Sequence, residues 1–199
     1  MDLGRFLLLA LVPFYRIKKI YIGDKEKVIN IKDGAILAAN HSGFSDPMVL
    51  ETAFWYRRVH YVVGEIAMEG KIKSTLMRGA GCIRIDRNAT DLKAVKQCVQ
   101  VLKDGFFLEM FPQGGIYGDD AGFKSGIMLI AVQADVPVIP LYIIQRKNIF
   151  QRYRLVIGDP FYWKDYCDKK MPGMKDIEKL TQLLEEKYNE CRTWKSKNN

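Results

Sequence analysis

Histidine and cysteine are scarce in this sequence of 199 residues, which holds two histidines, His41 and His60, and four cysteines. The cysteines lie far apart and form no Cys-x-x-Cys pair, so a Cys/His metal cluster is hard to assemble and no metal ion is expected. We interpret the cysteines as free, buried thiols of a reducing compartment. Because imidazoles are so few, the setting of each one is informative.

Long apolar runs are lacking as well. The run near the N-terminus is far shorter than the ~20 residues needed to cross a bilayer, and no small-residue cleavage site follows it, so a signal peptide is not expected. Two interpretations remain for residues 1–16: a helix packed on its own domain, or an apolar helix lying in a membrane interface beside basic residues. We favour the membrane-interface helix, followed by a single α/β domain over residues 17–199.

The sequence shows no internal repeat, low-complexity stretch or linker, in keeping with that single domain. Its formal net charge of +8 calls for an anionic partner, of which nucleic acid and anionic lipid are the usual two. An aromatic RNA-binding sheet signature, zinc-finger spacing and an Arg-rich arm are all missing, which argues against nucleic acid. Anionic lipid at a membrane surface is the expected partner.

Apolar periodicity predicts strands that alternate with helices. Prolines within residues 136–144 indicate an irregular or edge strand there, whereas its continuous apolar character indicates burial on both faces. The alternation predicts an α/β fold with a mostly parallel central sheet and helices on both faces. Strands are expected at residues 17–22, 35–39, 59–63, 82–87, 106–111, 136–144 and 153–157, with a turn at 23–26; helices are expected after Pro47, at 92–102 with Asn88 or Thr90 as cap, at 123–135 and at 177–194, while 65–79 is helical or irregular.

The stretch Asn-His-Ser-Gly-Phe-Ser-Asp at residues 40–46 directly follows a predicted strand. Asp46 suits a helix N-cap and Pro47 the first helical position, so His41 is expected on a loop at the end of a strand. If the loop folds back, which Gly43 makes easy, the Asp46 carboxylate can fix the imidazole tautomer and support its protonation. The alternative is an ordinary loop histidine beside a helix cap. His60, at the start of a strand, is expected to be structural.

Three further blocks follow this one in order: Gly-Cys-Ile-Arg-Ile-Asp-Arg at residues 81–87, Phe-Pro-Gln-Gly at 111–114 and Val-Pro-Val-Ile-Pro at 136–140. Together the four blocks resemble the glycerolipid acyltransferase family of the 1-acylglycerol-3-phosphate acyltransferase type. That family is known by a His-x-x-x-x-Asp block, a Gly-rich strand ending in Asp-Arg, a Phe-Pro-Glu-Gly-Thr-Arg block and a Val-Pro-x-x-Pro strand. The order of the blocks is more specific than any one of them.

The resemblance implies transfer of a fatty acyl group from an acyl thioester to the hydroxyl of a lysophospholipid, most simply 1-acylglycerol-3-phosphate to give phosphatidate. His41 is then the general base and Asp46 orients it. Because the substrate oxygen is the nucleophile, no Gly-x-Ser-x-Gly elbow is needed, and none is present. No cofactor is implied beyond the thioester, carried by acyl-carrier protein or coenzyme A. Arg87 matches the residue that meets the acceptor phosphate.

The substrate-binding block is Phe111, Pro112, Gln113 and Gly114, where glycine leaves room for backbone N–H groups to approach an oxyanion or phosphate. This block departs from the family pattern, because Gln113 replaces Glu and residues 115–116 are Gly-Ile instead of Thr-Arg. The family also often places Lys after the strand that ends near residue 63, where this chain has Gly-Glu. Lys71, Lys73 and Lys124 are candidate replacement cations. Structural alternatives remain: Arg87 pairs with Asp86 or Glu109 on the surface, and the Phe-Pro pair merely ends a strand.

The predicted function is therefore a lysophospholipid O-acyltransferase, peripheral or monotopic on the cytoplasmic face of the membrane. The altered block motivates a variant in which another lysolipid, an aminolipid or a glycolipid accepts the acyl group. Two other classes stay open: a non-catalytic lipid-surface binding protein with the same fold, and a thioesterase in which the histidine activates water.

Overall fold

The computed structural model describes residues 15–86, 91–114 and 122–197. The predicted N-terminal helix falls on residues 1–14, outside this part. Among the helices of the described residues, none is both long and apolar enough to cross a membrane.

The described strands form one seven-stranded sheet in the order β1-β7-β6-β2-β5-β3-β4. Neighbouring strands run parallel except for β6 and β7, which are antiparallel. The predicted α/β fold with a mostly parallel sheet is confirmed. The strands are β1 (Ile17–Tyr21), β2 (Ala35–Ala38), β3 (Val59–Gly64), β4 (Cys82–Ile85), β5 (Phe107–Met110), β6 (Val138–Ile144) and β7 (Tyr153–Ile157).

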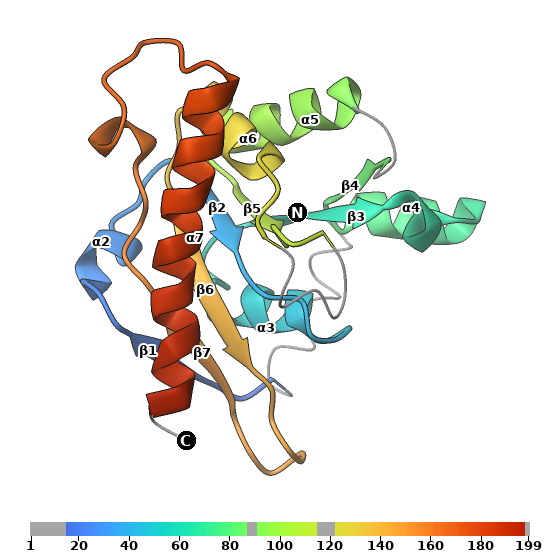
Figure 1. Ribbon diagram of the computed structural model, residues 1–199. Helices are drawn as coiled ribbons and strands as arrows, with labels where there is room; N and C mark the ends of the chain where they lie inside the picture. Colours follow the sequence, from blue (N-terminus) through green and yellow to red (C-terminus); the bar gives the residue numbers. More distant parts are fainter. Residues whose placement is uncertain (1–14, 87–90, 115–121, 198–199) are drawn as a thin grey trace.

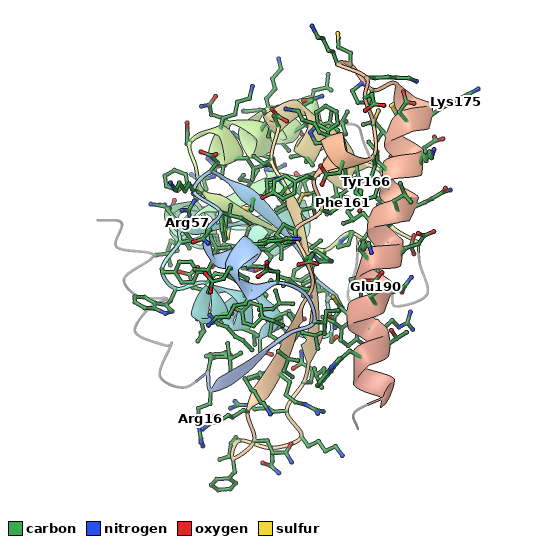
Figure 2. The ribbon with its side chains drawn as sticks, turned by 90° about the vertical axis from the view of Figure 1, so that its left-hand side faces the viewer. Arg16, Arg57, Phe161, Tyr166, Lys175 and Glu190 are labelled. Carbon is green, nitrogen blue, oxygen red and sulfur yellow. The ribbon has the colours of Figure 1, made fainter. Side chains whose placement is uncertain are left out.

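Helices cover both faces of the sheet, as Figures 1 and 2 show, with α7 on one side and α3 on the other. The apolar residues of α3 pack on one face, and those of α5, α6 and α7 pack on the opposite face, so the core has two layers separated by the sheet. The helices are α2 (Lys25–Ile29), α3 (Asp46–Ala53), α4 (Lys71–Gly79), α5 (Leu92–Lys103), α6 (Gly126–Ala134) and α7 (Met174–Lys197), with 3-10 turns η2 (Glu65–Met68) and η3 (Trp163–Asp165).

Strand β6 is neither irregular nor at an edge, contrary to the expectation from its prolines. It lies between β7 and β2, and all seven of its residues are buried. A proline removes a donor but keeps its acceptor. The carbonyl of Pro137 accepts from the Ile36 N–H at 3.0 Å, and that of Pro140 accepts from the Gly158 N–H at 3.0 Å. Each proline therefore still contributes to the ladder.

Two local predictions were wrong because side-chain oxygens nearer the helices act as caps. Helix α5 is capped by Asp91, whose carboxylate accepts from the Ala94 N–H at 2.9 Å, rather than by Asn88 or Thr90. The expected turn at residues 23–26 leads directly into α2, which Asp24 caps through the Glu26 N–H.

Candidate active site

The candidate site lies at the edge of the sheet where three adjacent parallel strands end. Strands β5, β2 and β6 are neighbours with matching direction, so Phe111, the loop over residues 40–46 and Gln145 all emerge at one edge. In open α/β sheets this carboxyl edge is where ligands bind. The fold thereby brings together blocks that are about a hundred positions apart in the chain.

Asn40 fastens the start of the loop to β6. Its side-chain oxygen accepts from the Ile143 N–H at 2.6 Å, and its amide nitrogen donates to the Ile143 carbonyl at 3.1 Å and to the Ser42 hydroxyl at 2.8 Å. The side chain is fully buried. Both the oxygen and the nitrogen of this side-chain amide are hydrogen-bonded, so the residue before His41 is held in one orientation.

Asp46 closes the loop. One carboxylate oxygen, Oδ2, accepts from the backbone N–H of Ser42 at 2.7 Å and of Gly43 at 2.8 Å, while Oδ1 accepts from the Gln145 side-chain amide at 2.5 Å. Asp46 is the first residue of α3 and not its N-cap, and its carboxylate reaches back to the loop; Ser45 holds the cap position, but its side chain makes no capping hydrogen bond. A fully buried side chain with this many donors is suited to the ionised carboxylate.

His41 completes the arrangement, with Nδ1 at 3.1 Å from Asp46 Oδ2. Since the carboxylate is an acceptor, Nδ1 carries the proton and Nε2 keeps its lone pair. The ring lies flat against Phe111, with centroids 4.0 Å apart and an angle of 9° between the planes. Its side chain is 13% exposed, so the imidazole is held on two sides and still open on another. This geometry suits a general base.

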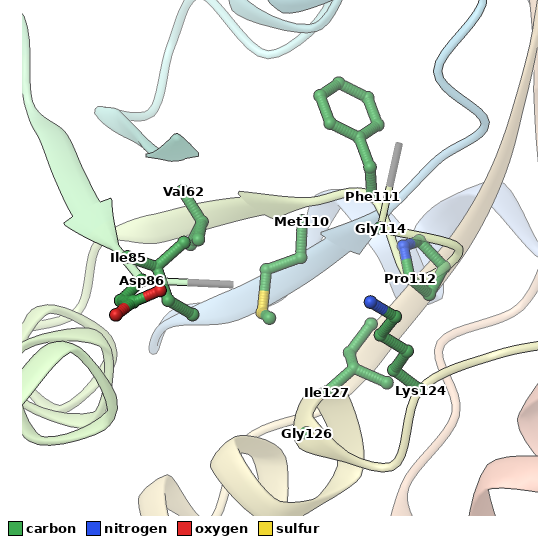
Figure 3. A pocket seen from close by; sticks show the side chains of 10 residues that line it. All are labelled: Val62, Ile85, Asp86, Met110, Phe111, Pro112, Gly114, Lys124, Gly126 and Ile127. Carbon is green, nitrogen blue, oxygen red and sulfur yellow. The ribbon is translucent and has the colours of Figure 1, made fainter. Parts of the chain in front are cut away.

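Beside Phe111 lies a cavity of about 190 Å³ between the ends of β3, β4 and β5 and the start of α6 (Figure 3). Its walls are mainly apolar, and Phe111 and Pro112 form part of them. Gln113 is buried and is not among the described lining residues. The lining side chains are Val62, Ile85, Met110, Phe111, Pro112 and Ile127, with Gly114 and Gly126 and the charged Asp86 and Lys124.

The turn at Phe111–Gly114 uses some of the backbone groups that were expected to serve a ligand. The Gly114 N–H donates to the Phe111 carbonyl at 3.0 Å, so this donor is already used within the turn. Gly114 has a φ of +81°, which favours glycine. A Cβ there would lie 2.7 Å from the Lys124 amine, so the open face of the glycine is where this cation rests.

Lys124 is the cation among the described residues that line the cavity, and Figure 3 shows its amine directed toward Gly114. Its backbone N–H donates to the Pro112 carbonyl at 3.0 Å, which ties the segment before α6 to the turn. Lys71 and Lys73, the other candidate replacements, are exposed on α4 and do not line this cavity. Arg87, Gly115 and Ile116 lie outside the described residues.

Comparison with known proteins agrees with this geometry. The family model described as "Acyltransferase" matches residues 19–144, which include the loop, the turn and the end of β6. The chain belongs to the acyltransferase family. The match spans more than half of its length and ends at the last residue of β6.

Several curated relatives of this acyltransferase have informative names. The 1-acyl-sn-glycerol-3-phosphate acyltransferase of Bacillus subtilis is 23% identical over 162 residues, covering 79% of this chain and 80% of the relative. The protein of the same name from Streptococcus pneumoniae is 26% identical over 181 residues, covering 86% and 67%. The crystal structure of the 1-acyl-sn-glycerophosphate acyltransferase of Thermotoga maritima superposes with a TM-score of 0.64, at 19% identity, over 96% of this chain and 81% of that one. This last similarity shows a shared fold.

A buried acidic cluster lies beneath the loop of this acyltransferase. One structural alternative placed Glu109 on the surface as a partner for Arg87, but Glu109 is fully buried in β5, next to Tyr61 of β3. Burial, with the charges of Asp46 and Glu51, raises the pKa of Glu109 well above its usual value. The Tyr61 hydroxyl donates to Glu51 at 2.6 Å, and burial raises the pKa of Tyr61. Burial thus favours the neutral acid form of Glu109 beneath the loop.

Two residues of the site were missed in the sequence. Gln145 follows a buried strand at the active edge, and the only signal for it is that position. Asn40 stands next to His41 in the first block, but its role depends on β6, which is 103 positions away. By contrast His60 is a strand residue whose ring Nδ1 lies 3.1 Å from the Gly81 carbonyl, and it is not among the described residues that line the cavity.

Proposed function

We propose that this acyltransferase moves a fatty acyl group from an acyl thioester to the free hydroxyl of 1-acyl-sn-glycerol-3-phosphate, forming phosphatidate. The observation that carries the proposal is the His41 imidazole, whose Nδ1 lies 3.1 Å from buried Asp46 and whose ring stacks on Phe111, a wall of the apolar cavity. The names of the relatives support the acceptor.

The reaction needs one base and no protein nucleophile. The acceptor hydroxyl loses its proton to His41 Nε2 while its oxygen attacks the thioester carbonyl. The tetrahedral intermediate then expels the thiolate, which takes the proton from the imidazolium, so that the ester, the free thiol and neutral His41 remain. Throughout, Asp46 keeps the Nδ1–H in place and stabilises the positive ring by charge.

Phe111 and Pro112 direct the lipid to this base. The cavity of about 190 Å³ is smaller than the ~300–1,000 Å³ of sites that enclose a whole small molecule, so it takes one part of a substrate and leaves the rest outside. Lys124 holds the acceptor phosphate at the mouth of this cavity, in place of the arginine that the block at residues 111–116 lacks. Gln113 is buried and is not among the described residues that line the cavity, so we assign it no contact with substrate.

A membrane-bound substrate calls for contact with a lipid surface. Helix α4 has no buried residue, and its Ile72 and Leu76 are 80% and 62% exposed, one turn apart on one face. Lys71 and Lys73 flank Ile72 in the sequence, as expected for a helix at the level of anionic headgroups. Together with the predicted N-terminal helix, α4 supports peripheral association with the cytoplasmic face of the membrane.

The function is tested by purifying the protein and its His41→Ala variant and following phosphatidate formation from lysophosphatidate with acyl-coenzyme A and with acyl-carrier-protein donors. His41→Ala should abolish transfer while circular dichroism stays native, and His60→Ala, the control for loss of an imidazole, should remain active. Wild-type rates in His41→Ala contradict the proposal. Thioester hydrolysis without acceptor indicates a thioesterase, and vesicle binding without thioester consumption indicates a binding protein.

The acceptor is tested with Lys124→Met, and Lys164→Met on η3 serves as the control. A charge-assisted hydrogen bond is worth roughly 1.5–3 kcal/mol, so Lys124→Met should raise the KM for lysophosphatidate by about 10- to 100-fold. The KM for monoacylglycerol, which lacks the phosphate, should not change. Equal changes in KM for both acceptors, or a wild-type enzyme that prefers an aminolipid or a glycolipid, would contradict lysophosphatidate as the acceptor.

A further inference from the structure

A second hollow opens on the other side of the catalytic loop, over β6, β7 and β1. Its volume is about 690 Å³, and it extends from Ser42, the residue after His41, to the hairpin that joins β6 and β7. Figure 1 shows this hairpin extending below the rest of the sheet. Unlike the apolar cavity, this basic groove has a size within the ~300–1,000 Å³ range of small-molecule sites.

Positive charge dominates the basic groove. Lys18, Lys147, Arg152 and Arg154 line it, and the described lining residues include no Asp or Glu. Lys18 and Arg154 are paired directly in the β1–β7 register, so their side chains share one face. Four cationic side chains around one hollow favour an anionic occupant.

The hairpin that carries two of these cations has a defined shape. The Asn148 side-chain oxygen accepts from the backbone N–H of Phe150 and of Gln151, each at 3.1 Å, and Gln151 in turn accepts from the Lys147 N–H at 3.0 Å. Lys147 and Arg152 are thus presented from an ordered turn, and less conformational entropy is lost when they bind a ligand.

The basic groove also extends to the loop that carries His41. Ser42 and Gln145 belong to its lining; Ser42 donates its N–H to Asp46, and Gln145 donates its side-chain amide to the same carboxylate. An occupant therefore ends beside the loop that holds His41. The cavity with Lys124 lies across β2 from this groove, so one molecule at each position flanks the base from two sides.

We propose that the basic groove binds the phosphate groups of a coenzyme A thioester, the acyl donor, with Lys18, Lys147, Arg152 and Arg154 as its cationic contacts. A diphosphate and a ribose phosphate carry more charge than one lysine can match, and paired arginines suit phosphate oxygens. The thioester end then points along the groove to Ser42 and the catalytic loop. The inference rests on the proposed acyl transfer and specifies its donor.

Binding is measured first, because it does not require activity. Calorimetry with coenzyme A and with pantetheine, which lacks the phosphates, should show binding of coenzyme A only. Lys147→Glu/Arg152→Glu should weaken coenzyme A binding at least about tenfold, whereas Lys96→Glu/Lys179→Glu, with the same change in net charge on α5 and α7, should leave it unchanged. Binding of coenzyme A that is unaffected by the groove variant, or equal binding of pantetheine, overturns the proposal.

Kinetics then separates donor from acceptor. The groove variant should raise the KM for acyl-coenzyme A at least about tenfold, with no change in the KM for lysophosphatidate or for an acyl-pantetheine donor. Two outcomes contradict the donor site but leave the proposed acyl transfer intact. One is a wild-type enzyme that transfers only from acyl-carrier protein. The other is a groove variant that loses binding to phosphatidylglycerol vesicles while it keeps its affinity for coenzyme A. Failure of transfer from every donor contradicts the proposed function itself.

Discussion

Asp46→Asn isolates the charge of the aspartate from its hydrogen bonds. With its oxygen at the position of Oδ2, the asparagine can still accept from Ser42, Gly43 and His41. Its NH₂ group then faces Gln145, whose amide can turn to present an oxygen. The loop should therefore keep its shape while the negative charge beside the imidazole is lost.

The size of the effect follows from the distance. Opposite unit charges 3.1 Å apart attract by about 5 kcal/mol at an effective dielectric constant of about 20. That energy corresponds to a factor of about 10⁴ if the whole proton is on His41 in the transition state. Because transfer is incomplete there, we expect kcat to fall by about 10³- to 10⁴-fold with little change in KM.

The assay is release of free thiol from acyl-coenzyme A in the presence of lysophosphatidate, with thermal unfolding measured in parallel. Asp46→Ala, which removes the acceptors of two backbone N–H groups, should lower the Tm more than Asp46→Asn does. The double variant His41→Ala/Asp46→Asn should be no slower than His41→Ala alone, since the aspartate acts through the histidine. An Asp46→Asn enzyme that keeps more than about a tenth of kcat refutes this reasoning.

Glu109→Gln should stabilise the protein increasingly as pH rises. The raised pKa of Glu109 means that the folded state keeps a proton that the unfolded state releases above its usual value, so wild-type stability is lost with rising pH by up to about 1.4 kcal/mol per unit. Glutamine does not ionise, and urea unfolding at pH 5 and pH 8 should show a larger advantage of the variant at the higher pH; an equal difference at both contradicts a protonated Glu109. Asn40→Ala should destabilise by roughly 1–3 kcal/mol, because the buried Ile143 N–H loses its acceptor, and should reduce kcat as well. Denaturation and kinetics on the same sample check this, and an unchanged kcat shows that Asn40 does not position His41.

The features that could be predicted from the sequence are local ones. The alternation of apolar strands and amphipathic helices identified the sheet, because each element's pattern is contained within its own residues. The contact between His41 and Asp46 could be predicted for the same reason, since the two residues are five positions apart and a glycine lies between them. The order of the blocks then identified the family.

What could not be predicted depends on contacts between distant segments. Gln145 reaches Asp46 across 99 positions, and no local pattern marks it. The alternative of a surface Glu109 paired with Arg87 is wrong for Glu109, because its strand lies inside the sheet, between β2 and β3, and the side chain is buried. The choice of Lys124 over Lys71 and Lys73 likewise required the turn at Phe111–Gly114 to be seen beside the start of α6.

The stacking of His41 on Phe111 has a consequence for the energy of the reaction. While the imidazole is neutral, the two flat rings at 4.0 Å interact mainly by dispersion. Once the ring takes up a proton, a cation lies over the negative face of an aromatic quadrupole, an arrangement worth about 0.5–2 kcal/mol. In the proposed mechanism this attraction grows as the proton is transferred, so Phe111 is expected to lower the barrier as well as to shape the cavity. A leucine there would keep an apolar wall but lose this stabilisation of the transition state.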